Sequence, residues 1–243
     1  MTRRTILAVL VLLLGSLPAL PPPIADAREV NTRRPGVYMG RQIAWTMTAD
    51  GADWLTRESR EKEESAREMI RALGLESGQV VADVGSGNGY HALAMAPLVG
   101  PSGRVLCVDI QQEMLDLLAE RAQEKGITNV DLILGEPTSP RLPRETVDLI
   151  LLVDAYHEFT DPAAMLAAMR ASLKPTGVLA LVEYRAEDPT VPIKRDHKMS
   201  KAQIDKEMTA NGFTLVRSYD GLPWQHLLFY GLDDAGEGPV PTP

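Results

Sequence analysis

Three glycines spaced one residue apart constrain this chain more than any other feature, because they follow directly on a short apolar run. Residues 80–84, Val-Val-Ala-Asp-Val, are typical of a buried strand, and residues 91–96 continue in a helical pattern. Between them lies Gly85-x-Gly87-x-Gly89. Glycines at a strand-to-helix turn permit positive φ and let a ligand approach the backbone, and the amides that open the helix face that ligand. The pattern predicts a nucleotide-like ligand on this turn.

Two aspartates suggest which ligand this is. Asp83 lies two positions before the first glycine, and Asp109 ends the next apolar run, residues 104–110. A carboxylate beside the turn suits an ammonium group and repels a pyrophosphate. An acid at the end of the second strand can accept both hydroxyls of a ribose. One acid for an amine and one for a ribose indicates S-adenosylmethionine (SAM).

With these residues the chain resembles the class I SAM-dependent methyltransferases over residues 79–231, with a general similarity to quinone-biosynthesis-type methyltransferases. The resemblance implies a Rossmann-like α/β fold, a doubly wound sheet of seven strands with an antiparallel last strand. It implies SAM as the cofactor, bound at the carboxyl ends of the strands. The predicted cofactor-binding residues are Asp83, Gly85, Ser86, Gly87, Asn88, Gly89, Asp109, Ile110, Glu136, Asp154 and Tyr156.

The rest of the chain alternates strand and helix patterns, as expected for a doubly wound sheet. A charged helix is expected from Arg57 to Leu73, with its Glu/Lys/Arg run forming a solvated face. Further strands are expected at residues 130–134, 146–153, 178–184, 213–218 and 225–230.

The first 27 residues have the pattern of a secretory signal peptide. Arg3 and Arg4 precede a continuous apolar run over residues 6–14, and Ala25-Asp26-Ala27 fits a small-x-small cleavage site. The run is short for a bilayer span, which needs about 20 residues. We therefore expect an exported protein, periplasmic or secreted, cleaved after Ala27 and without a stable membrane span. The alternative is an uncleaved N-terminal anchor.

The mature chain is expected to hold one catalytic domain with short additions. Residues 28–56 are predicted to be an N-terminal extension, whose aromatic side chains form either a lid over the substrate pocket or a staple against the sheet edge. Residues 57–232 are predicted to be the methyltransferase domain, and residues 233–243, rich in glycine and proline, a disordered tail.

Composition limits the partners. The formal net charge is −8, and no cluster of Lys and Arg is interleaved with aromatic residues, so nucleic acid is not an expected partner. The single cysteine, Cys107, lies inside the predicted second strand and is expected in the core.

Methyl transfer from a sulfonium is an in-line displacement, so the protein mainly positions two reactants and excludes water. A general base is needed only when the nucleophile carries a proton. His157, just past the fourth predicted strand, is the predicted catalytic residue; the alternative is that it only hydrogen-bonds its loop. The four histidines lack metal-ligand spacing, so no metal site is expected. Predicted substrate contacts are Tyr38, Arg41, Tyr184 and His197.

The sequence therefore predicts an enzyme, a SAM-dependent methyltransferase acting on a small-molecule acceptor. One alternative is an exported SAM-binding module without catalysis. A second is an NAD-dependent oxidoreductase, which is disfavoured because the third glycine comes one residue early for the dinucleotide motif.

Overall fold

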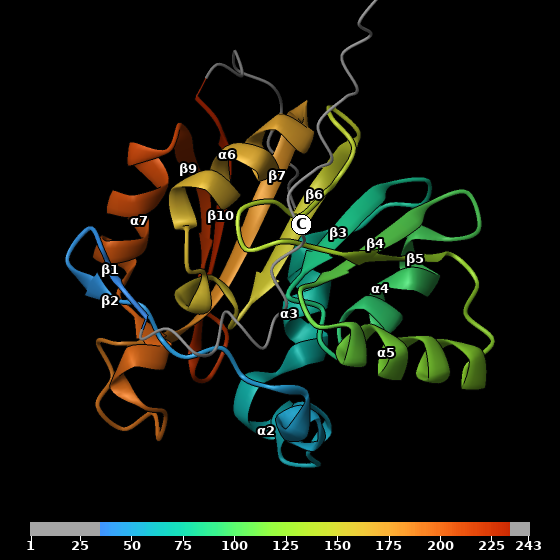
Figure 1. The fold of residues 1–243 in the computed structure, drawn as a ribbon, viewed down its shortest axis with the longest axis horizontal. Coiled ribbons are helices and arrows are strands. Elements are labelled where there is room, and N and C mark those ends of the chain that lie inside the picture. The colour runs from blue at the N-terminus through green and yellow to red at the C-terminus, as the bar shows by residue number, and fades with distance from the viewer. Residues whose placement is uncertain (1–34, 234–243) are drawn as a thin grey trace, which may run out of the picture.

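An eight-stranded mixed sheet forms the centre of the computed structural model, which describes residues 35–233 (Figure 1). Its strands are β3 (Val80–Val84), β4 (Arg104–Asp109), β5 (Val130–Leu134), β6 (Val147–Val153), β7 (Leu173–Arg185), β8 (Lys198–Met199), β9 (Phe213–Tyr219) and β10 (Gln225–Leu232). Seven follow the order β5-β4-β3-β6-β7-β10-β9, and the two-residue β8 pairs with β7. The strands from β5 to β7 are parallel, whereas β10 is antiparallel to both of its neighbours. The predicted Rossmann-like fold with an antiparallel last strand is confirmed.

Helices cover both faces of this sheet. They are α3 (Ala66–Leu73), α4 (Ala92–Val99), α5 (Gln112–Glu124), α6 (Pro162–Ser172) and α7 (Lys201–Ala210). Apolar side chains of α3, α4 and α5 pack in one core cluster, and those of α6 and α7 pack in a second on the other face. Figure 1 shows α4 and α5 on one side of the sheet and α7 on the other.

The central strand β6 shows why the sheet is covered twice. Leu149 and Leu151 belong to the first cluster, whereas Ile150 and Leu152 belong to the second. Successive side chains of a strand point to opposite faces, so a continuous apolar run is buried on both. Cys107 of β4 is buried in the first cluster, as predicted. Among residues 35–233, we find no helix with the length and apolar character that a membrane span requires.

The segment before the sheet forms a small hairpin, β1 (Val37–Tyr38) and β2 (Arg41–Gln42), followed by a 3-10 helix, η1 (Ala49–Thr56). In Figure 1 the hairpin lies beside α7. Arg41 of β2 joins the two elements, since its Nε donates to Glu207 Oε1 at 2.9 Å and its Nη2 to Oε2 at 3.0 Å. Glu207 is fully buried, so this ion pair anchors the hairpin to the domain.

The predicted charged helix over residues 57–73 is wrong in two respects. It is broken into α2 (Arg60–Glu64) and α3 by Ser65, whose φ of 51° is left-handed. Its charged residues are also not all solvated: the side chains of Arg67 and Arg71 are exposed, whereas Arg60 and Glu64 are buried. Glu64 accepts hydrogen bonds from Arg57, Arg60 and the hydroxyl of Tyr184, 120 residues further on, and these partners compensate its burial.

The predicted signal peptide, residues 1–27, lies outside the described residues. The same holds for residues 234–243 of the predicted tail.

Candidate functional site

A cavity of about 590 Å³ lies at the carboxyl edge of the parallel strands. Residues that follow β3, β4, β5 and β6 line it together with Tyr184 of β7. Residues 45–47 and 54–55 of the N-terminal segment, and residues between 192 and 197 in the loop after β7, also form part of its wall. The strand order reverses direction between β3 and β6, which is the switch point where open α/β sheets bind ligands. The volume lies in the range of small-molecule sites. This cavity is therefore the candidate functional site.

The glycine turn after β3 brings backbone to the cavity surface. Gly85 and Gly87 line the cavity with φ of 80° and 50°. A Cβ on Gly85 would lie 2.6 Å from the Cβ of Ala155, and one on Gly87 would lie 2.7 Å from Cδ1 of Leu55. Both conformation and space therefore require glycine at these two positions.

Asp109, at the end of β4, presents a fixed carboxylate to the cavity. Its Oδ2 accepts from the Gly87 amide and its Oδ1 from the Gln111 amide, both at 2.9 Å. Burial raises the pKa of Asp109 to about 6, while these backbone amides favour the ionised form. Each carboxylate oxygen keeps a further acceptor position, so Asp109 can accept the two hydroxyls of a ribose.

Asp154, just after β6, is a second carboxylate in the wall. Its Oδ2 accepts from Gln225 Nε2 at 2.6 Å, whereas its buried Oδ1 has no partner among the described residues. Burial raises the pKa of Asp154, and the nearby carboxylates of Glu64 and Glu183 raise it further. An ammonium group would satisfy the unpartnered oxygen and favour the ionised form.

Asp83, the acid predicted to lie beside an amine, is placed differently. It is buried and is absent from the residues that line the cavity. Burial raises the pKa of Asp83 to about 7, and the backbone amide of Ala92, at the start of α4, opposes this rise. Asp83 therefore lies outside the cavity lining, and Asp154 is the better placed acid for a cation in the cavity.

The remaining predicted cofactor residues divide into two groups. Ile110 and Glu136 line the cavity, where Met114 and Pro137 provide apolar surface beside them. Ser86, Asn88, Gly89 and Tyr156 are buried and do not line it. Asn88 holds the turn in place by accepting from Arg121 and donating to the carbonyl of Ala52. Tyr156 instead donates its hydroxyl to Glu207 at 2.7 Å.

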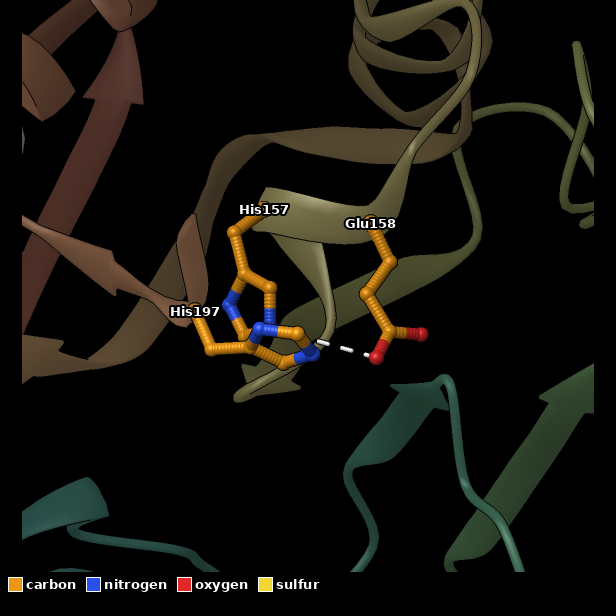
Figure 2. Close-up of side chains that lie close together, drawn as sticks. All are labelled: His157, Glu158 and His197. Atoms are coloured by element: carbon orange, nitrogen blue, oxygen red, sulfur yellow. Dashed lines mark ion pairs between the residues drawn. The ribbon is translucent and has the colours of Figure 1, made fainter. Parts of the chain in front are cut away.

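His157, Glu158 and His197 lie together in another part of the wall (Figure 2). His157 and Glu158 belong to η2 (Tyr156–Glu158), after β6, and His197 belongs to η3 (Arg195–His197), after β7. His157 is buried, and its Nδ1 donates to Glu183 Oε2 at 2.6 Å. Burial opposes a charge on the ring, but Glu183 outweighs it and raises the pKa of His157 to about 9.

Of the four predicted substrate contacts, the structure brings two to the cavity. His197 and Tyr184 line it, and the Tyr184 hydroxyl donates to Glu64 at 2.7 Å. Tyr38 and Arg41 do not line it. The Tyr38 hydroxyl accepts from Asn211, and Arg41 is held by Glu207, so both contribute to anchoring the hairpin.

Sequence reasoning missed several residues of the wall. Glu158 lines the cavity five residues after a predicted strand, and Glu183, the partner of His157 behind the wall, lies near the end of the next; position after or near a strand end was the available signal. Trp45 and Trp54 were anticipated only as part of a lid or a staple; both are half-exposed and line the cavity, which favours the lid alternative. Met47 joins them and donates its amide to Glu158.

Taken together, the lining fits SAM. Gly85 and Gly87 provide a cradle that side chains would fill, Asp109 offers acceptors for a ribose, and Asp154 has an unpartnered oxygen for an amine. Five described carboxylates line the cavity, Asp109, Glu136, Asp154, Glu158 and Asp196. They outnumber its basic side chains, Arg60, Lys194 and the two histidines His157 and His197, which suits a ligand with positive charge.

Comparison with known proteins agrees with this geometry. A family model described as a methyltransferase domain matches residues 75–233. The chain is 33% identical over 124 residues to the uncharacterized methyltransferase YcgJ of Bacillus subtilis, covering 51% of this chain and 48% of that protein. It is 30% identical over 119 residues to the ubiquinone/menaquinone biosynthesis C-methyltransferase UbiE of Marinomonas sp., covering 49% of this chain and 47% of that protein. The chain thus spans about half the length of these curated relatives.

The fold is similar to that of a SAM-dependent methyltransferase from Aquifex aeolicus, with a TM-score of 0.72. The likeness covers 76% of this chain and 98% of that one at 23% identity, and at this identity it shows the fold alone.

Proposed function

Since this chain belongs to the SAM-dependent methyltransferase family, we propose that it transfers a methyl group from SAM to a small-molecule acceptor bound in the same cavity. The observation that carries the proposal is one cavity with two chemically different walls. Gly85, Asp109 and Asp154 form one wall, and the other contains the polar cluster around His157.

The first wall would hold the cofactor. Asp109 would accept the ribose hydroxyls, and the backbone at Gly85 and Gly87 leaves room for a ligand against the turn. Asp154 would accept from the amine through its unpartnered Oδ1. When bound, SAM supplies a methyl group already activated on a sulfonium. The task left to the protein is to orient the two reactants and exclude water.

The second wall would hold the acceptor. His157 points a buried Nε2 without a described hydrogen-bond partner toward this side, which is a polar contact for an acceptor atom. Trp45, Trp54 and Ile193 provide apolar surface around it. The cavity volume of about 590 Å³ favours a small molecule as the acceptor.

Calorimetry and turnover together test this proposal. We expect the purified protein to bind SAM and S-adenosylhomocysteine at one site per chain, and to release S-adenosylhomocysteine from SAM when a library of small acceptors is supplied. His157→Gln should reduce turnover while cofactor binding persists. His226→Gln serves as the matched control, since His226 does not line the cavity.

Two outcomes would count against the proposal. Absence of binding to either compound would remove the function altogether. Binding without turnover on any acceptor would favour the non-catalytic SAM-binding module instead. Unchanged turnover in His157→Gln would remove only the role given to that side chain.

We also propose that the protein is exported. The basic start, the apolar run over residues 6–14 and the Ala25-Asp26-Ala27 pattern support this location. Cell fractionation with mass spectrometry of the mature N-terminus tests it. A protein that starts at residue 28 outside the cytoplasm is expected, whereas an intact N-terminus in the membrane fraction would indicate the anchor.

A further inference from the structure

Two histidines and a glutamate, separated by up to 40 residues in sequence, converge on one point of the cavity wall. One potential ligand atom each from His157, Glu158 and His197 lies within 4.8 Å of the others. Figure 2 shows the two imidazole rings side by side, with the carboxylate of Glu158 directed toward them. The three side chains come from loops after the adjacent strands β6 and β7, so the sheet itself brings them together.

The second ring nitrogen of each histidine is held by a carboxylate. His157 Nδ1 donates to Glu183 Oε2 at 2.6 Å, and His197 Nδ1 lies 3.0 Å from Asp196 Oδ1. Metal-binding histidines almost always donate their other N–H to a carboxylate, a carbonyl or water, which fixes the ring and its tautomer. Both rings therefore have the outer partners of a metal site, and each offers its Nε2 as a ligand atom, from which a bound metal would release any proton held there.

His157 Nε2 is the strongest sign that something belongs here. His157 is 1% exposed, and this nitrogen has no hydrogen-bond partner among the described residues. It lies 3.9 Å from Glu158 Oε1, too far for a hydrogen bond. A buried polar atom without a partner is costly, and a cation between the ring and the carboxylate would satisfy both.

We propose that His157, Glu158 and His197 bind a divalent transition-metal ion on the acceptor side of the cavity. Two imidazole nitrogens and one carboxylate oxygen suit zinc, iron(II), cobalt(II) or manganese(II). Zinc–nitrogen bonds of 2.0–2.1 Å place tetrahedral ligands roughly 3.3 Å apart, so small side-chain rotations close the observed separations. The excess of carboxylates in the wall favours a cation there.

Three protein ligands leave at least one coordination position open. Because all three ligands line the cavity, the open position faces the space assigned to the acceptor. It would take water, or an oxygen or nitrogen of the acceptor. The metal site itself does not depend on methyl transfer, since metal binding is measured without donor or acceptor.

The test uses the full-length protein with an affinity tag that contains no histidine. After treatment with a chelator, Zn²⁺, Co²⁺, Mn²⁺ or Fe²⁺ is titrated by calorimetry, under argon for iron, and bound metal is counted by mass spectrometry. We expect one ion per chain for at least one of these metals. Co²⁺ should give visible d–d absorption bands that indicate nitrogen ligands.

Variants assign the site. His197→Ala and Glu158→Gln should each weaken metal binding at least tenfold, and Asp196→Asn, which changes only an outer partner, by about 10–100-fold. His226→Gln, a histidine outside the cavity, should leave affinity unchanged. No variant of His157 is used in this test, because His157 is buried and its substitution could prevent folding. His197 and Asp196 are partly exposed, so their variants test the site in a folded protein.

The proposal is overturned if none of the four ions binds near one equivalent, or if His197→Ala and His226→Gln behave alike. Binding of S-adenosylhomocysteine is measured on the same samples. If S-adenosylhomocysteine binds while no metal does, the metal site fails and the proposed methyltransferase stands. If metal binds while S-adenosylhomocysteine does not, the proposed methyltransferase fails and the metal site stands.

Discussion

Two buried aspartates on neighbouring strands, Asp83 and Asp109, have different access to the cavity. Asp109 lines it and is oriented by two backbone amides, whereas Asp83 is buried outside the cavity lining. The local sequence placed Asp83 inside one predicted strand and Asp109 at the end of the next. It could not show which one faces the ligand, because that depends on how the turn folds over the end of the strand.

Asp109→Asn should weaken binding of SAM. Hydrogen bonds to a charged group contribute about 1.5–3 kcal/mol, which corresponds to roughly 10–100-fold in the dissociation constant. Isothermal titration with SAM measures this change. Asp116→Asn, at an exposed position of α5, is the matched control and should bind normally. Equal affinity for wild type and Asp109→Asn would contradict the ribose contact.

Asp83 should make stability depend on pH. Its pKa of about 7 in the folded protein lies above the ordinary value of 3.8, so the folded state keeps a proton that the unfolded state releases. This contribution is complete below about pH 4 and is lost as pH rises through 7. The free energy of unfolding of wild type, relative to Asp83→Asn, should therefore fall between pH 4 and 7, by at most about 1.4 kcal/mol per pH unit.

Urea denaturation at intervals of half a pH unit measures this difference. The comparison with Asp83→Asn cancels the contribution of Asp109, whose pKa is also raised. A difference that is flat with pH, or that rises, would show that Asp83 is ionised in the folded protein.

At the scale of elements, the strand β3 and its glycine turn were predictable because they are local in sequence. The broken helix over residues 57–73 was not. Its charges look solvated in isolation, but Arg60 and Glu64 are buried, and Glu64 accepts a hydrogen bond from Tyr184 of a distant strand. A pattern of charges along one helix carries no information about partners 120 residues away.

The glycine turn should not tolerate a methyl group. Gly85→Ala is expected to cost about 1 kcal/mol for a left-handed alanine, plus about 1–3 kcal/mol for the collision with Ala155. Gly126→Ala shares the positive φ but has no heavy atom within 4 Å of the added Cβ, so it should show only the first cost. Chemical denaturation gives the free energy of unfolding of both variants, and the difference between them measures the cost of the collision. Equal losses in the two variants would contradict a collision at Gly85.

The hairpin β1–β2 should depend on Glu207 for its position. Removing one partner of a buried ion pair typically costs about 3–5 kcal/mol, because the other charge stays buried without compensation. Glu207→Ala should therefore destabilise the protein by about this amount and leave Arg41 and the Tyr156 hydroxyl without their partner. Glu120→Ala, on the exposed face of α5, is the control with little expected effect. Thermal and urea denaturation compare the two variants.

At the scale of the whole molecule, the cavity joins parts of the chain that no motif links. Strand order and the position of the ligand edge follow from the alternation of strands and helices, and both were predictable. The wall formed by Trp45 and Trp54, and the convergence of His197 with His157, are products of tertiary packing. The spacing of the four histidines is a local property of the sequence and carries no information about such convergence.

Ligand binding should be visible in tryptophan fluorescence. Trp45 and Trp54 line the cavity and are 46% and 41% exposed, whereas Trp224 does not line it. A ligand that displaces water from the two indoles should shift their emission to shorter wavelength. Titration with S-adenosylhomocysteine and with acceptors tests this expectation. The shift should be lost in the double variant Trp45→Phe/Trp54→Phe and kept in Trp224→Phe; the opposite pattern would place the ligand elsewhere.

Hydrogen bonds from residues 41–47 support the turn that carries His157 and Glu158. Arg41 Nη1 and the Ala44 amide both donate to the His157 carbonyl, and the Met47 amide donates to Glu158. The turn that carries the polar cluster is thus braced by residues that precede the family-matched region, which begins at residue 75. A fragment trimmed to that region would contain every strand of the main sheet, but it would lack the residues that hold the His157 and Glu158 turn in place.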